Sequence, residues 1–251
     1  MMTRQPPPGP FRYHLVRLVL RGVLAAYVRT NVVGRERIPS AGSYIICFNH
    51  PSWLDPVFFA AHWPDRERLL YVFGPREQDM STGVRNRIIT WTRRGVAFQP
   101  NAQDVIDVTR RTVAVLRRDS CLAIAGEGRL SDHEGRILPL ETGLAHFSRM
   151  ADAPILPAAI VGSRWISFGS RVTIRIGSPV YPGSFARGKP GARAMTDVVQ
   201  ERLQSLLAGV PEREPPGWFG RTISEAFNDR PWLDEVDHVG TGDPPPGSPE
   251  G

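Results

Sequence analysis

The chain has 251 residues, of which 41% are hydrophobic and 22% are charged. This length and composition fit one globular domain with short extensions and exclude a chain that is disordered throughout. The formal net charge of +6 gives a cationic surface, which favours an anionic partner such as a membrane face, a phosphorylated substrate or nucleic acid.

Two cysteines and the amino-terminal composition bear on the compartment. Cys47 and Cys121 both lie inside apolar runs, where a free cysteine usually acts as a small buried hydrophobe. Residues 6–10 are rich in proline, and no small-residue cleavage site follows the next apolar run, so no cleavable signal peptide is expected. Together these features predict a reducing compartment. For a chain that also binds lipid, they predict a peripheral membrane protein on the cytoplasmic face.

The first 34 residues are expected to hold a disordered start and one amphipathic helix. The helical periodicity covers residues 11–29 and places His14, Arg17 and Arg21 on one face. The two arginines interrupt every apolar run before it reaches the roughly 20 residues that span a bilayer. The pattern therefore favours an interfacial helix whose arginines meet anionic headgroups. The alternative is an amphipathic helix packed on its own domain.

The remaining periodicity predicts a single α/β domain over residues 35–232, followed by a disordered tail over residues 233–251. Apolar or alternating runs predict strands at residues 44–48, 69–73, 96–98, 121–125, 154–161 and 171–176. Helical spacing predicts helices at residues 51–61, 84–92, 104–118, 142–150 and 192–207. This alternation is typical of a mixed, mostly parallel β-sheet flanked by helices on both faces.

The strand at residues 44–48 ends in a polar elbow. Asn49 and His50 follow the strand directly, and Asp55 comes after four further residues, within the first turn of a helix. A carboxylate at this spacing can hold one ring nitrogen of the histidine, fix its tautomer and make the other nitrogen more basic, as a general base for a hydroxyl requires. The alternative is a turn histidine and an aspartate that is favoured at the start of a helix for its charge alone.

A second polar group follows the apolar strand at residues 121–125. Glu127, Gly128 and Arg129 lie at the strand end, where ligand sites of α/β proteins usually form. The glycine allows a ligand close to the backbone, and the guanidinium can hold an anion with two hydrogen bonds. The alternative is an ordinary polar turn.

In combination, these two groups resemble the glycerolipid and lysophospholipid acyltransferase superfamily, which includes the 1-acylglycerol-3-phosphate O-acyltransferases. The family's His-x4-Asp motif is matched by His50 and Asp55, with the usual asparagine present as Asn49. Its Pro-Glu-Gly-Thr-Arg block is represented by a shorter form at residues 126–129, and its downstream proline-containing apolar block is similar to residues 153–158. The similarity extends over about residues 30–180.

Two departures from the family pattern concern the acceptor. The family's second block ends in an arginine, but residues 95–101 contain none, and Arg93 and Arg94 lie just before the block instead. Glu141 stands where many relatives carry a lysine, close to Gly143. Both changes remove positive charge near the expected acceptor pocket. The acceptor is therefore left open between 1-acylglycerol-3-phosphate, another lysophospholipid, a glycolipid and an amino-acid lipid.

The resemblance implies a membrane-associated O-acyltransferase that uses acyl-CoA or acyl carrier protein as its donor and needs no metal or redox cofactor. His50 would be the general base, and Asp55 would orient it. The residues that the resemblance implies for substrate binding are Asn49, Arg93, Arg94, Glu127, Gly128, Arg129 and Pro157. A non-catalytic lipid-binding protein on the same fold is the alternative.

Other classes have weaker support in the sequence. Residues 183–189 match most of a phosphate-binding loop, but Pro190 replaces the Ser or Thr that would hold magnesium. The histidines show no metal-ligand spacing with the two cysteines, so no zinc site is expected. Paired arginines occur without a nucleic-acid-binding motif, and no nucleic-acid partner is expected.

Overall fold

The computed structural model describes residues 10–75, 92, 94–98, 102–131 and 133–228. The expected disordered ends, most of the helix predicted at residues 84–92, and Arg93 lie outside these residues. The description below refers to this part of the chain.

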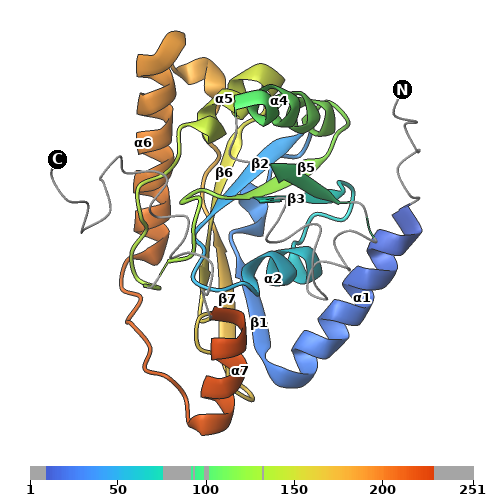
Figure 1. Cartoon of the computed structure of the whole chain (residues 1–251), viewed down its shortest axis with the longest axis vertical. Coiled ribbons are helices and arrows are strands. Elements are labelled where there is room, and N and C mark those ends of the chain that lie inside the picture. The colour runs from blue at the N-terminus through green and yellow to red at the C-terminus, as the bar shows by residue number, and fades with distance from the viewer. Residues whose placement is uncertain (1–9, 76–91, 93, 99–101, 132, 229–251) are drawn as a thin grey trace, which may run out of the picture.

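A seven-stranded sheet forms the centre of the described structure (Figure 1). Its strands lie side by side in the order β1-β7-β6-β2-β5-β3-β4. All neighbours run parallel except β6 and β7, so the predicted mixed, mostly parallel α/β sheet is confirmed. The strands are β1 (Arg29–Val33), β2 (Tyr44–Phe48), β3 (Leu70–Pro75), β4 (Gly95–Phe98), β5 (Cys121–Ala125), β6 (Ile155–Val161) and β7 (Arg171–Ile176).

Helices cover both faces of the sheet, as an apolar parallel sheet requires. One apolar core joins the sheet to α1 (Pro10–Tyr27), α2 (Asp55–His62) and α7 (Trp218–Asn228). A second core, on the opposite face, joins it to α4 (Ala102–Leu116), α5 (Gly143–Ala151) and α6 (Gly188–Leu207). Figure 1 shows α6 and α1 at opposite sides of the molecule. The central strands β2 and β6 are buried at every position, since both their faces are covered.

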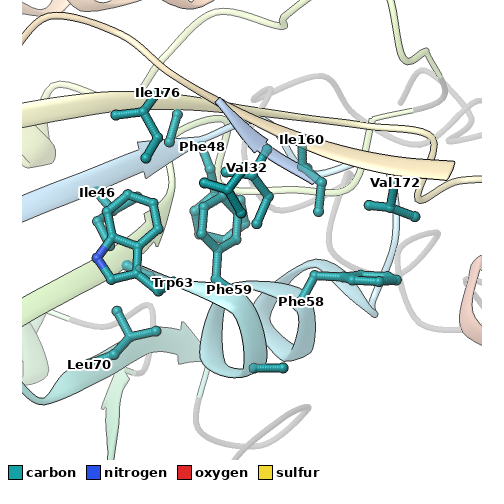
Figure 2. Packing of buried hydrophobic residues seen from close by; sticks show 14 of the residues in the cluster. Val32, Ile46, Phe48, Phe58, Phe59, Trp63, Leu70, Ile160, Val172 and Ile176 are labelled. Atoms are coloured by element: carbon teal, nitrogen blue, oxygen red, sulfur yellow. The ribbon is translucent and has the colours of Figure 1, made fainter. Parts of the chain in front are cut away.

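The α2 helix is fixed to the sheet by large aromatic side chains. Phe58, Phe59 and Trp63 are fully buried and point from α2 toward the strands (Figure 2). The indole Nε1 of Trp63 also donates a hydrogen bond of 2.8 Å to the hydroxyl of Tyr44 on β2. Because Asp55 is the first residue of α2, this packing sets the position of its carboxylate.

Two described elements differ from the prediction. The helix expected to continue to residue 29 ends at Tyr27, and Arg29–Val33 forms β1 in parallel with β7. Thr30, Val32 and Val33 are β-branched residues that suit a strand, but the segment was too short to outweigh the helical pattern before it. The second element is α7, which covers residues 218–228, where no helix was predicted.

The α1 helix packs on the domain with the face that carries Tyr13, Arg17 and Leu24. Arg17 is buried, and its guanidinium donates hydrogen bonds to the backbone carbonyls of Trp63 and Asp65. Phe11, Leu18 and three other apolar side chains of the helix are instead exposed. The helix therefore has a packed face and an apolar open face. None of the described helices is long and apolar enough to cross a membrane.

The aromatic packing of α2 leads to a stability prediction. Phe58→Ala should lower the free energy of unfolding by about 3–5 kcal/mol, because it leaves a cavity in the core between α2 and the sheet. Urea denaturation of the purified variants would measure the change. The matched control Phe11→Ala removes a side chain that is 74% exposed and should change stability by less than about 0.5 kcal/mol. Equal losses in the two variants would contradict the described packing.

Candidate active site

The site begins where β2 leaves the sheet. Asn49 is completely buried, and its side-chain amide pairs with the backbone of Ile160 on the neighbouring β6. Its Oδ1 accepts the Ile160 N–H at 2.7 Å, and its Nδ2 donates to the Ile160 carbonyl at 3.0 Å. The amide thus continues the β2–β6 connection after the last strand residue, Phe48. This fixes the point at which the next residue, His50, departs from the sheet.

His50 and Asp55 face each other across the elbow. Nδ1 of His50 lies 2.9 Å from Oδ2 of Asp55, and the same oxygen accepts the backbone N–H of Ser52 at 2.8 Å. Asp55 is fully buried at the first residue of α2, where the helix dipole favours a negative charge. The other ring nitrogen of His50, Nε2, makes no hydrogen bond with the described residues. This arrangement can hold a proton on Nδ1 and leave Nε2 to accept one.

Two aromatic rings fix the plane of the imidazole. The rings of Phe48 and Trp53 meet that of His50 edge to face, with centroid distances of 5.7 and 5.8 Å. Such contacts favour one ring orientation over its alternatives. The His50 side chain is 11% exposed, so the ring is largely enclosed but not sealed.

Glu127 connects the end of β5 to the elbow. Its Oε1 accepts the backbone N–H of His50 at 3.1 Å, and its Oε2 accepts the backbone N–H of Leu138 at 3.0 Å. Burial raises the pKa of Glu127, and the two backbone amides oppose that rise. The family resemblance places Glu127 among the substrate-binding residues. In the structure its side chain holds the backbone of His50.

The segment that follows Glu127 runs beside the elbow. Gly128 has a φ of 68°, which favours glycine, and both it and Arg129 are exposed. The backbone N–H of Ser131 donates to the His50 carbonyl at 2.8 Å. Arg129 is exposed and lies two residues before Ser131, which contacts the backbone of His50 directly. Glu141, the departure noted in the sequence, also lies here, because its N–H donates to the Gly126 carbonyl at 3.0 Å.

Two buried residues of this site were not predicted from the sequence. Glu134 is fully buried, and its Oε1 accepts the backbone N–H groups of Gly162 at 3.1 Å and Arg164 at 2.9 Å. Between these lies Ser163, whose side chain lowers the pKa of Asp55. Ser163 comes just after β6, and this position was a usable signal, since the same reasoning identified Glu127 after β5. Glu134 lies further along the loop after β5 and gave no such signal.

Burial raises the pKa of all three carboxyl groups at the site. For Asp55 the rise is opposed by His50, Ser163 and the Ser52 amide. For Glu134 it is opposed by the backbone of Arg164 and by the charge of Arg213, whereas the nearby charge of Asp55 adds to it. The site therefore holds several carboxyl groups that are costly to ionise in the folded state.

The structure does not bring two other predicted site residues to His50. Arg94 donates to the hydroxyl of Tyr71 and lies over the rings of Tyr71 and Tyr13, at 4.9 and 5.9 Å from their centroids. The strand register places it level with Ile45, so it is about 16 Å from His50 along the strand direction, at about 3.3 Å per residue.

Pro157 lies within β6 and pairs with Cys47, whose side chain belongs to the core of α4, α5 and α6. The ring of His50 instead contacts Phe48, which belongs to the opposite core. Pro157 therefore lies deeper in the sheet than the elbow, and its strand position faces away from the imidazole. Within the described residues, no group of three or more His, Cys, Asp or Glu side chains is placed to hold a metal ion.

The described structure is an α/β sheet with a histidine–aspartate pair at the carboxyl end of a central strand, and comparison with known proteins identifies its family. The model of the Acyltransferase family matches residues 29–161, more than half of the chain, so the chain belongs to this family. The resemblance to the 1-acylglycerol-3-phosphate acyltransferase superfamily is thereby confirmed, and the protein is an acyltransferase.

Two individual proteins show the extent of the similarity. The 1-acyl-sn-glycerol-3-phosphate acyltransferase of Bacillus subtilis (strain 168) is 20% identical over 208 residues, which cover 77% of this chain and 96% of that protein. The crystal structure of the 1-acyl-sn-glycerophosphate (LPA) acyltransferase, PlsC, from Thermotoga maritima has the same fold, with a TM-score of 0.59 and 19% identity. That match covers 80% of this chain and 81% of the PlsC chain.

The raised carboxyl pKa values predict how stability depends on pH. Between the ordinary pKa of a glutamate and the raised pKa of folded Glu134, the unfolded chain has lost a proton that the folded chain keeps. The free energy of unfolding should therefore fall as pH rises through this window. Glu134→Gln keeps one oxygen acceptor and removes the ionisation, so its stability should fall less over the same range.

Urea denaturation between mildly acidic and neutral pH would measure both curves. Glu36→Gln is the matched control, because the side chain of Glu36 is 75% exposed. Parallel curves for the wild type and Glu134→Gln would contradict the effect of burial on this carboxyl group.

Proposed function

We propose that this protein transfers a fatty acyl group from a thioester, either acyl-CoA or acyl-acyl carrier protein, to a hydroxyl of a lysolipid at a membrane surface. The observation that carries the proposal is the 2.9 Å contact between His50 Nδ1 and Asp55 Oδ2 at the end of β2. In a chain of the Acyltransferase family, this pair is the group best placed to act as a base.

The proposed reaction uses the acceptor hydroxyl as its nucleophile. Nε2 of His50 takes the hydroxyl proton while the oxygen attacks the thioester carbonyl, and Asp55 stabilises the imidazolium that forms. The tetrahedral intermediate then expels the thiolate, which recovers the proton from His50 as a thiol. The result is one ester and one free thiol. The logic is that of a Ser-His-Asp triad in which the substrate replaces the serine, so no acyl-enzyme forms.

Arg129 is the proposed contact for an anionic group of the acceptor. It is exposed beside Glu127, whose carboxylate holds the His50 backbone, so an acceptor bound there would present its hydroxyl near the imidazole. The names of the B. subtilis and T. maritima relatives support 1-acylglycerol-3-phosphate or a similar lysophospholipid. Glu141 beside Gly128 places a negative charge there, and this keeps glycolipid and amino-acid lipid acceptors open.

Membrane association is proposed from the open face of α1. Phe11, Leu18 and Val23 are 74%, 70% and 63% exposed, and Leu15 and Val19 lie on the same side. An exposed apolar face on a helix held against its domain fits insertion into the headgroup region, where arginines nearby meet anionic lipids. Both substrates are amphiphilic and concentrate at such a surface.

Replacement of the proposed base tests the reaction. His50→Ala should reduce acyl transfer by about 10²–10⁴-fold, the usual contribution of a positioned acid–base group. Mass spectrometry of products from a panel of lysolipids with acyl-CoA and acyl-acyl carrier protein would measure it. The control His146→Ala alters an exposed histidine on α5 and should retain normal turnover. Near-normal turnover by a folded His50→Ala variant would refute the base. Absence of any product from the wild type would favour a lipid-binding role.

A second test addresses the open face of α1. The double variant Leu18→Gln/Val23→Gln should bind vesicles containing anionic lipid at least about tenfold more weakly, because it replaces two of the three most exposed apolar side chains of this face. Co-sedimentation would measure the binding. Val105→Gln/Ile106→Gln is the matched control, since these side chains are 57% and 59% exposed on α4. Unchanged binding by the α1 variant, or equal losses in both, would refute membrane binding through α1.

A further inference from the structure

A cavity lies away from the histidine–aspartate pair, between α1, β1 and the end of α2. Its volume is about 430 Å³, within the range of small-molecule sites. Asp55 begins α2 and His62 ends it, and eight helical residues span about 12 Å. Because the cavity is lined by His62 and the residues that follow it, it lies at the opposite end of this helix from the catalytic pair.

The wall of this cavity is strongly cationic. Five arginines line it, and no aspartate or glutamate does. Of these five side chains, only that of Arg17 has hydrogen-bond partners among the residues that the structure describes, the carbonyls of Trp63 and Asp65. The other four form no ion pair with the residues that the structure describes. They come from α1, β1 and two loops and are Arg21, Arg29, Arg35 and Arg66.

His62 adds a neutral hydrogen-bonding group to this wall. Its Nε2 is buried and has no hydrogen-bond partner among the described residues. Burial, together with the charges of Arg21 and Arg17, lowers the pKa of His62 to about 4, so the ring is neutral at pH 7. The same positive potential that disfavours a cationic imidazole favours a bound anion. A buried polar atom without a partner calls for an explanation, and a bound ion or water is one of the usual ones.

We infer that this cavity binds a phosphate-bearing group. Guanidinium groups hold phosphate oxygens with paired hydrogen bonds. Here several arginines line one concave site that contains no carboxylate, an arrangement that suits phosphate recognition. The phosphate belongs either to the headgroup of a membrane lipid or to a soluble ligand. Arg21 extends from α1, whose apolar side chains Leu18 and Val23 are exposed close by in the sequence, so a headgroup can meet the cavity while its chains follow the helix.

The test compares two double variants with the same change in charge. Arg29→Gln/Arg66→Gln removes two exposed arginines of the cavity, and Arg117→Gln/Arg118→Gln removes two exposed arginines after α4 on the opposite face. The full-length proteins are titrated with inorganic phosphate by calorimetry. In parallel they are co-sedimented with phosphatidylcholine vesicles that contain phosphatidylglycerol. Circular dichroism and the thermal midpoint confirm that both variants are folded.

Each arginine should contribute slightly more than about fivefold to binding, so the cavity variant should bind at least one probe about 30-fold more weakly. The binding of the control variant should change about twofold or less. Loss of vesicle binding alone identifies a lipid headgroup as the source of the phosphate, and loss of phosphate binding alone identifies a soluble ligand. Equal losses in the two variants, or no binding of either probe by the wild type, would overturn the inference. Acyl transfer is not a readout, so this failure leaves the proposed reaction untouched.

Discussion

The hydrogen bond between His50 and Asp55 is the interaction on which the proposed chemistry depends, and most of the surrounding structure restrains its two ends. The Asn49 amide and the Glu127 carboxylate fix the backbone of the histidine through β6 and β5. The aspartate is fixed through α2, whose aromatic side chains pack into the sheet core. Only four residues lie between His50 and Asp55, but each side chain is fixed through a different element, so a shift of either support would change the distance between them.

The α2 helix also connects two charged regions of opposite character. Its first residue lies among carboxyl groups whose pKa values burial raises, and its last residue lies among arginines that lower the pKa of His62. The carboxyl groups are at the positive end of the helix dipole, where the proposed proton transfer takes place. The positive charge is at the other end, beside α1. A lipid held by its phosphate near α1 and an acceptor near Arg129 would thus occupy separate sites on one protein.

The fold and the contact between His50 and Asp55 were predictable because their signals are local. Alternating apolar runs gave the sheet class, and the spacing of Asn49, His50 and Asp55 placed them at one elbow, where the structure finds them. The strand β1 and the role of Glu127 were not predictable, since each depends on a partner far along the chain. Arg94 and Pro157 adjoin family blocks in sequence, but strand register separates them from the imidazole. Glu134 and Ser163 act through loops whose contacts no periodicity reveals.

The central claim is that Asp55 holds the proton on Nδ1 of His50 and leaves Nε2 free to accept one. Nitrogen-15 NMR of histidine-labelled protein at neutral pH measures this tautomer directly, with His50→Ala to assign the resonance. The structure predicts a protonated Nδ1 and an unprotonated Nε2, and a larger population of the opposite tautomer in Asp55→Asn. A wild-type His50 that carries its proton on Nε2 at neutral pH would contradict the account.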